Sequence, residues 1–126
     1  MKYKDKKVIA FDLDDVLCER PNVNAGEVEK YNFCKPIQSM VDFCNECDDS
    51  GHEVIIYTAR GMTTQNGNVN KVYSKLYNLT LNQLKKWGVN HHQLVMGKIH
   101  YDYLIDYKAH NYNGENLNKI KKSLEI

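Results

Sequence analysis

Two aspartates near the start of the chain, Asp12 and Asp14, follow directly after the apolar residues 8–11. The apolar run is short, continuous and partly β-branched, which is typical of a parallel strand buried on both faces. In open α/β sheets, ligands bind beyond the carboxyl ends of the strands, where both carboxylates would lie. Two neighbouring carboxylates repel each other unless they share a proton or a cation, and oxygen ligands favour magnesium. The pair therefore predicts a metal or acid–base site, although an isolated Asp-x-Asp is more often an ordinary polar turn.

Three more polar residues stand where later apolar runs end. They are Thr58 after the run 54–57, Lys98 after 94–96, and Asp106 after 103–105. Because parallel strands end at the same edge of a sheet, we expect these side chains to lie together with the two aspartates. Carboxylates, a hydroxyl and an amine in one place are the groups that phosphoryl transfer needs.

In a phosphoryl transfer the two aspartates would have different tasks. Asp12 would be the nucleophile that attacks phosphorus and forms an aspartyl-phosphate. Asp14 would protonate the leaving oxygen and later activate the water that cleaves this intermediate. Thr58 and Lys98 would hold the phosphoryl oxygens, and the lysine would supply positive charge to the transition state.

The substrate and metal sites are predicted around the same strand ends. Backbone N–H groups at Ala59 and Arg60 would also hold phosphoryl oxygens. The Arg60 guanidinium either binds a phosphate or carboxylate of the substrate or forms a structural ion pair. Asp12, Asp14 and Asp106 are the candidate magnesium ligands, with a backbone carbonyl among the donors.

An alternation of strand-like and helix-like segments would position these residues. The segments between strands carry apolar residues at three- and four-residue steps, which is typical of helices with one buried face. The predicted strands are 8–11, 54–57, 94–96 and 103–105, and the predicted helices are 36–47, 69–87 and 117–124. The order β-α-β-α-β-β-α predicts an α/β fold with a mostly parallel sheet and right-handed crossovers.

The stretch over residues 19–35 contains Pro21 and Gly26 and is long for a connection between a strand and a helix. We expect it to form a flap over the strand ends. The whole chain, residues 1–126, is expected to be one domain, because its length allows one complete core and not two.

The composition excludes several function classes. The net charge is only +1, which gives no electrostatic reason to expect nucleic acid or an anionic membrane as a partner. The apolar stretches are too short to span a bilayer. The first seven residues lack the apolar core of a signal peptide, so a cytoplasmic protein is expected.

Four cysteines, Cys18, Cys34, Cys44 and Cys47, are compatible with a reducing compartment. Two disulfides are an alternative, but a secreted disulfide scaffold would be shorter and richer in cysteine. Cys44 and Cys47 form a CxxC on the buried face of the first helix, near its end, whereas a reactive CxxC lies at a helix N-terminus. We therefore expect both thiols to pack in the core. Zinc is disfavoured because no second pair has ligand spacing.

These residues together resemble the haloacid dehalogenase-like (HAD) superfamily of phosphatases. Its first motif, Asp-x-Asp-x-(Thr/Val), is similar to residues 12–16, and its second, an apolar strand ending in Thr or Ser, is similar to residues 54–58. The lysine of the third motif and the acid of the fourth resemble Lys98 and Asp106. The similarity spans most of the chain, and the order and spacing of the motifs carry it.

Residues 58–62 and 97–109 look like a small capless group within this superfamily, often found in bacterial capsule or lipopolysaccharide sugar pathways. The resemblance implies a three-layer Rossmann-like fold, a magnesium ion (Mg2+), and a small phosphomonoester such as a sugar phosphate. The fourth motif of this group usually carries two acids, whereas Tyr107 replaces the second one here. Magnesium binding is then expected to be weaker, unless Asp102 compensates.

Three alternatives compete with a phosphatase. A response-regulator receiver would need a phosphoacceptor aspartate at a strand end between Asp12 and Thr58, and the sequence has none there. A thioredoxin-like redox protein is disfavoured by the position of the CxxC in its helix. A protein that binds magnesium or a sugar phosphate without turnover stays open, and Tyr107 favours it.

A capless phosphatase leaves its site open to water. Phosphoryl transfer to a carboxylate benefits from the exclusion of water, and a small sugar needs contacts on more than one side. We therefore expect a homo-oligomer in which the flap or the C-terminal region of one chain covers the strand ends of another. A large substrate, such as a glycan or a protein, is the alternative.

Overall fold

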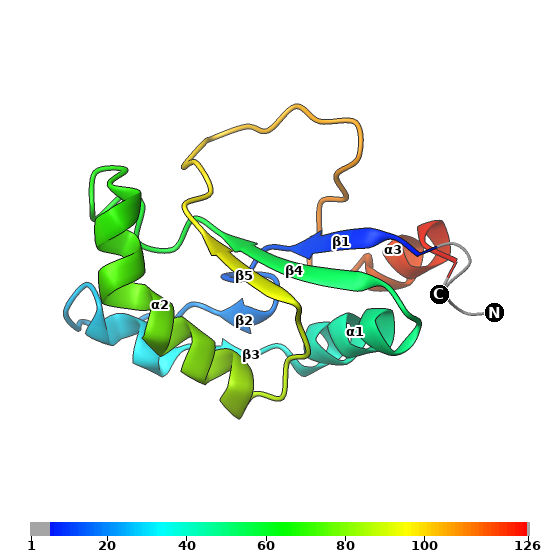
Figure 1. The fold of residues 1–126 in the computed structure, drawn as a ribbon, viewed down its shortest axis with the longest axis horizontal. Helices are drawn as coiled ribbons and strands as arrows, with labels where there is room; N and C mark the ends of the chain where they lie inside the picture. The colour runs from blue at the N-terminus through cyan, green and yellow to red at the C-terminus, as the bar shows by residue number, and fades with distance from the viewer. Residues whose placement is uncertain (1–5, 126) are drawn as a thin grey trace.

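The computed structural model describes residues 6–125, which form a mixed α/β fold (Figure 1). Three strands form a parallel sheet in the order β1-β4-β5, and β2 and β3 form a separate antiparallel pair. The strands are β1 (Val8–Phe11), β2 (Cys18–Glu19), β3 (Lys35–Pro36), β4 (Glu53–Thr58) and β5 (Gln93–Met96). The helices are α1 (Gln38–Asp49), α2 (Val69–Lys86) and α3 (Leu117–Ser123), with a 3₁₀-helix, η1, over Glu29–Phe33. The predicted α/β class and the parallel sheet are confirmed.

One face of the parallel sheet carries the core. Along β4, Val54, Ile56 and Thr58 are buried while Tyr57 is exposed, as the two-residue period of a strand requires. Figure 1 shows α1, α2 and the β2–β3 pair on the same side of the sheet. The prediction that β1 is covered on both faces is wrong, because Val8 and Ala10, which share one face of the strand, are exposed.

The helix predicted over 69–87 is confirmed as α2. Its buried side chains recur every four residues, at Val72, Leu76, Thr80 and Leu84. The Asn68 side chain caps its start by accepting a hydrogen bond from the Lys71 backbone N–H at 3.1 Å. Gly88, with a φ of 70°, follows its end in the left-handed conformation that glycine tolerates. Within residues 6–125, no helix is long and apolar enough to cross a bilayer.

Helix α1 begins at Gln38 and not at Pro36 as predicted. Pro36 pairs with Cys18 between β3 and β2, so the helix starts only after this short strand has ended. Cys44 and Cys47 are fully buried on its inner face, which confirms their expected place in the core. Burial is the main reason why the pKa of each thiol is raised to about 12.

The predicted flap, residues 19–35, is only partly free of the core. Residues 22–27 are exposed, whereas Tyr31 in η1 is buried. The Gln83 side chain on α2 donates a hydrogen bond to the Tyr31 carbonyl oxygen. The second half of the flap is therefore packed against α2, and the first half faces solvent.

The predicted fourth strand over residues 103–105 is wrong. Residues 97–116 form a long arch between β5 and α3 that contains neither helix nor strand (Figure 1). Tyr103 and Ile105 are almost fully exposed in it. An apolar pattern becomes a strand only when a neighbour pairs its backbone N–H and C=O groups, and residues 103–105 do not pair with the open edge of β1. Among the described residues, the sheet therefore ends at β1.

Candidate functional site

The carboxyl ends of three strands bring Asp12, Thr58 and Lys98 together. Asp12 follows β1, Thr58 ends β4, and Lys98 comes two residues after the end of β5. The Lys98 Nζ atom lies 3.5 Å from Asp12 Oδ2. The Lys98 backbone N–H donates a hydrogen bond to the Thr58 carbonyl oxygen at 3.1 Å. A carboxylate and an amine thus share the edge of the sheet at which ligands of such folds bind.

Local backbone contacts hold the first two of these side chains. Asp12 Oδ1 accepts a hydrogen bond from the Leu13 backbone N–H at 2.8 Å. The Thr58 hydroxyl accepts one from the Arg60 backbone N–H at 3.0 Å, and Thr58 is buried. In this arrangement Thr58 stabilises the turn after β4, and Ala59 lies within that turn.

Lys98 lies between a carboxylate and two aromatic rings. Its Nζ atom is 5.7 Å from the centre of the Tyr57 ring and 5.3 Å from that of Tyr101, within the range of cation–π attraction. Burial alone would lower the pKa of Lys98, but the charge of Asp12 and a hydrogen bond with Tyr101 raise the pKa above its usual value. Lys98 therefore stays cationic at neutral pH and can stabilise anionic oxygens beside Asp12.

Asp14 forms a bidentate ion pair with Arg60. Arg60 Nη2 lies 2.8 Å from Asp14 Oδ1, and Arg60 Nε lies 3.1 Å from Asp14 Oδ2. Arg60 is only 3% exposed. Burial would lower the pKa of this guanidinium, but the hydrogen bonds and charge of Asp14 raise it overall. Of the two roles that the sequence leaves open for Arg60, the structure shows the structural ion pair.

Arg60 also joins the turn after β1 to α2 and η1. Its Nη1 donates hydrogen bonds to Thr80 Oγ1 at 3.2 Å and to Gln83 Oε1 at 2.6 Å. The plane of the guanidinium lies over the Tyr31 ring, 4.5 Å from its centre. A buried cation is tolerated only when its donors are paired, and these contacts supply the partners.

Cys18 and Cys34 gather beside Asp14, which the sequence analysis missed. Their sulfur atoms and an Asp14 carboxylate oxygen all lie within 4.8 Å of one another. Cys18 Sγ donates a hydrogen bond to Asp14 Oδ1 at 3.4 Å, and Arg60 Nη2 lies 3.8 Å and 3.7 Å from the sulfur atoms of Cys18 and Cys34. The hydrogen bond between the two thiols lowers the pKa of Cys34 and raises that of Cys18.

A signal for this cluster is present in the sequence. Cys18 stands four residues after Asp14, in a tight turn in which the backbone N–H groups of Leu17 and Cys18 donate to the Leu13 carbonyl oxygen. Cys34 stands where the flap returns to that turn. Two cysteines at the two ends of one loop are candidates for contact, because the ends of a compact loop lie close together.

The predicted magnesium ligands do not come together. Both Asp14 oxygens are held by Arg60, and Asp106 lies exposed in the arch, where its Oδ1 accepts a hydrogen bond from the Lys108 backbone N–H at 3.2 Å. Within residues 6–125, Asp12, Asp14 and Asp106 form no group of close ligand atoms. In this arrangement they do not fit a magnesium ion. The Asp14 cluster does not fit it either, since magnesium disfavours sulfur and the Arg60 cation already stands among the donors.

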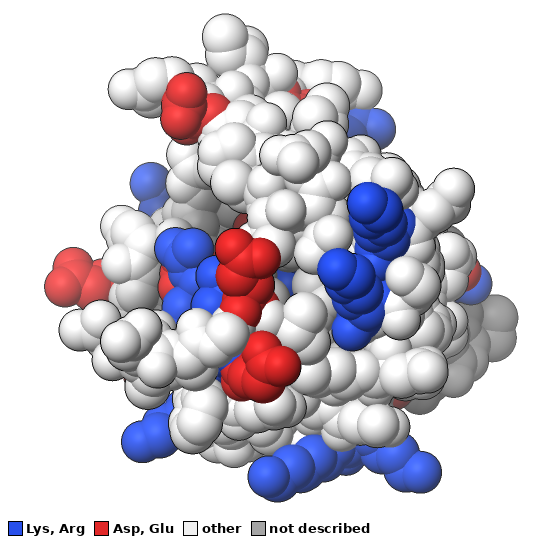
Figure 2. Space-filling view, turned by 90° about the vertical axis from the view of Figure 1, so that its left-hand side faces the viewer, with Lys and Arg blue, Asp and Glu red and all other residues white. Residues whose placement is uncertain are grey.

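The side of the molecule at which the strands end carries charges of both signs. Figure 2 shows acidic and basic side chains next to one another near the centre of this side. Neither sign dominates, in keeping with the net charge of +1. An anionic ligand would therefore be attracted by single cations such as Lys98 and not by a broad positive field.

Comparison with solved structures shows a similar fold in a structural genomics target from Vibrio cholerae. The two structures match with a TM-score of 0.73 and 25% sequence identity, over 94% of this chain and 98% of that chain. The similarity covers almost the whole of both chains and supports the α/β fold. No model of a known protein family matches the chain, and no curated protein matches it.

Proposed function

We propose that this chain is a HAD-like phosphomonoesterase that acts through an aspartyl-phosphate on Asp12. The observation that supports this function is the 3.5 Å separation of Asp12 Oδ2 and Lys98 Nζ at the strand ends. A lysine fixed beside a carboxylate attracts phosphoryl oxygens to the nucleophile and neutralises their charge during attack. The substrate is a small phosphorylated molecule such as a sugar phosphate, and the capless Rossmann-like fold belongs to the same proposal.

The reaction would have two steps at phosphorus. A carboxylate oxygen of Asp12 attacks phosphorus, a new O–P bond forms, and the O–P bond to the alcohol breaks. A water molecule then attacks the aspartyl-phosphate, which releases phosphate and restores the carboxylate. Lys98 stabilises the phosphoryl oxygens in both steps. The Arg60 backbone N–H, predicted as a further donor, already donates to the Thr58 hydroxyl.

Asp14 is proposed to give the leaving alcohol its proton, a role that requires one of its oxygens to leave Arg60. Asp14→Asn tests this role. For an alkyl phosphate, kcat/KM should fall by about a hundredfold or more, because general acids contribute that much when the leaving group is poor. For p-nitrophenyl phosphate, whose leaving group needs no proton, the loss should stay below about tenfold. If kcat/KM falls equally for both substrates, Asp14 is not the proton donor, and its role is the structural ion pair with Arg60.

The function itself is tested by phosphate release from p-nitrophenyl phosphate and from a panel of sugar phosphates. The nucleophile variant Asp12→Asn and a control, Asp15→Asn, are assayed beside the wild type. Asp15 lies in the same turn at a φ of 69°, a conformation that asparagine adopts well, so the control should keep its fold and activity. Equal rates in all three proteins would contradict the proposal.

Magnesium dependence is a separate prediction of the HAD resemblance. The structure holds Asp106 in the exposed arch, so binding at the strand ends requires this arch to move. Asp106→Asn is expected to raise the magnesium concentration for half-maximal rate by roughly tenfold, a usual effect of weakening a metal site. Glu115→Gln, an exposed acid in the same arch that is not among the candidate ligands, is the control. An unchanged magnesium requirement in Asp106→Asn would remove Asp106 from the metal site.

A second candidate is a protein that binds a phosphorylated sugar without turnover. The ion pair of Asp14 with Arg60 favours it, since it engages both oxygens of the proposed acid. Binding of a sugar phosphate in calorimetry, together with no phosphate release, would support this candidate. The cytoplasmic location, the capsule or lipopolysaccharide pathway and the homo-oligomer remain predictions from the sequence.

A further inference from the structure

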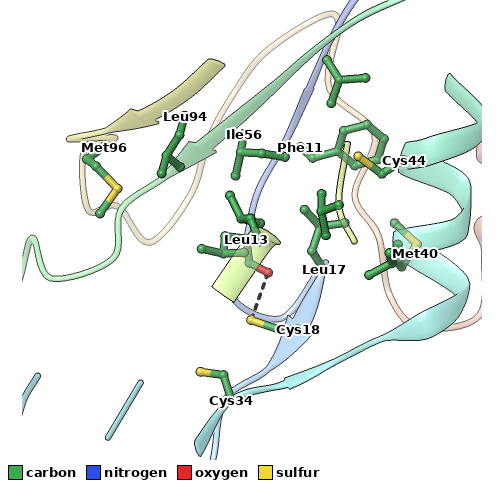
Figure 3. Close-up of a cluster of buried hydrophobic side chains, with 14 of the residues drawn as sticks. Phe11, Leu13, Leu17, Cys18, Cys34, Met40, Cys44, Ile56, Leu94 and Met96 are labelled. Carbon is green, nitrogen blue, oxygen red and sulfur yellow. Dashed lines mark hydrogen bonds between the residues drawn. The ribbon is translucent and has the colours of Figure 1, made fainter. Parts of the chain in front are cut away.

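Two thiols that the proposed reaction does not use lie at the two ends of the flap. Cys18 is in β2 and Cys34 directly precedes β3, so residues 19–33 form a loop between them. Figure 3 shows their side chains next to each other below Leu13, and their sulfur atoms lie within 4.8 Å. Both residues are buried, Cys18 completely. A disulfide places its sulfur atoms about 2.05 Å apart. Cys18 pairs with Pro36 between β2 and β3, so Cys34 lies diagonally across from it, and a link requires the backbone of this pair to shift.

The surroundings favour reaction of these thiols over metal binding. Arg60 Nη2 lies 3.8 Å from Cys18 Sγ and 3.7 Å from Cys34 Sγ, and it bonds Asp14 Oδ1 at 2.8 Å. The guanidinium thus occupies the place from which a metal ion would contact all three donors. A cation beside sulfur stabilises the negative charge that an attacking sulfur carries.

Only one of the two thiols can be reached from outside. A pocket of about 380 Å³ lies between the end of η1 and α2, and Cys34 lines it together with Asn32, Gln83, Lys86 and Trp87. Cys18 does not line this pocket and is completely buried. A small reagent would therefore meet Cys34 first, and Cys18 would be the second thiol to react.

We propose that Cys18 and Cys34 form a reversible disulfide by exchange with a small-molecule disulfide that enters this pocket. The Cys34 thiol loses its proton to solvent and its sulfur attacks one sulfur of the reagent; the S–S bond of the reagent breaks, and its other half leaves as a thiolate that takes a proton from solvent. The Cys18 sulfur, after losing its proton to solvent, then attacks Cys34, and the second half of the reagent leaves as a thiol. The protein loses two electrons and two protons, and the reagent gains them.

This disulfide would link the two ends of the flap to each other. It would also remove the hydrogen bond from the Cys18 thiol to Asp14 Oδ1. Cys44 and Cys47 provide the internal comparison, because they form a CxxC but are fully buried in the core. Neither of these two thiols lines the pocket that Cys34 lines, so a reagent in that pocket should not reach them.

Oxidised glutathione tests the proposal on the folded full-length chain. Peptide mapping by mass spectrometry should find a Cys18–Cys34 link, which dithiothreitol should reverse, while Cys44 and Cys47 stay open to alkylation after denaturation. Cys18→Ala should stop at a mixed disulfide with glutathione on Cys34, and Cys34→Ala should not react. A variant with both Cys44 and Cys47 changed to Ala should still form the link.

Three results would overturn the proposal. The first is a link that joins Cys44 to Cys47 in the native protein. The second is the absence of any link, or of glutathione addition, under conditions in which the urea-unfolded chain reacts. The third is tight binding of zinc that requires Cys18 and Cys34, since the two thiols would then be metal ligands. None of these readouts depends on phosphatase activity.

Discussion

Replacement of Asp12 by asparagine is expected to abolish phosphate release and to leave the fold intact. An amide cannot form the acyl-phosphate, and loss of a nucleophile usually lowers kcat by about a thousandfold or more. The asparagine Oδ1 can still accept the hydrogen bond that Asp12 accepts from the Leu13 N–H. Thermal unfolding of the variant should therefore resemble that of the wild type. Retention of more than about a tenth of the rate would rule out Asp12 as the nucleophile.

Trapping of the intermediate gives a second measurement of the same step. A rapid acid quench of the wild type with substrate should leave phosphate attached to the chain, on the peptide that contains residue 12. The same quench of Asp12→Asn should leave none. A phosphopeptide from another region would transfer the nucleophilic role to that region, even if Asp12→Asn were inactive.

Arg60→Leu is expected to lower the free energy of unfolding by about 3 kcal/mol. Removal of one partner of a buried ion pair leaves the other charge without compensation, which costs several kcal/mol. Here the change would remove the hydrogen-bond partner of Asp14 and of the Gln83 and Thr80 oxygens that Arg60 contacts. Urea denaturation, followed by circular dichroism, measures the loss.

Arg20→Leu is the matched control for this change. Arg20 also pairs with an aspartate, Asp15, but both side chains are more than half exposed. Exposed pairs contribute at most about 1 kcal/mol, so this control should unfold close to the wild type. Similar losses in both variants would contradict the structural role of Arg60. A double change of Arg60 and Asp14 to Leu should recover part of the loss, because it leaves no buried charge unpaired.

Local periodicity was enough to predict the elements that build the sheet and cover it. The four-residue spacing of Val72, Leu76 and Leu84 marks α2, and the apolar run over 54–57 marks β4. These patterns succeed because Val54 and Ile56 of β4 and the three α2 residues are all buried in the core. Asp12 and Lys98 meet for a related reason, since the ends of parallel strands share one edge.

Contacts between segments distant in sequence could not be predicted in the same way. The run over 103–105 has the composition of a strand, but a strand also needs a partner with free backbone groups, and the sequence does not specify that partner. The cluster of Asp14, Cys18, Cys34 and Arg60 depends on how the flap returns to the turn after β1. No periodicity marks such a return, because loops fold through particular contacts and not through repeated ones.

The arch over residues 97–116 has a consequence for local stability. Between residues 99 and 107, no backbone N–H donates a hydrogen bond to any acceptor in residues 6–125. Opening such a segment breaks almost nothing, so its amide protons should exchange with deuterium nearly as fast as those of an unfolded peptide. The amides of β4, which lies at the centre of the sheet, should exchange only when the whole domain unfolds. The most and the least protected amide protons are therefore expected in neighbouring parts of the chain, since β5 pairs with β4 and leads directly into the arch.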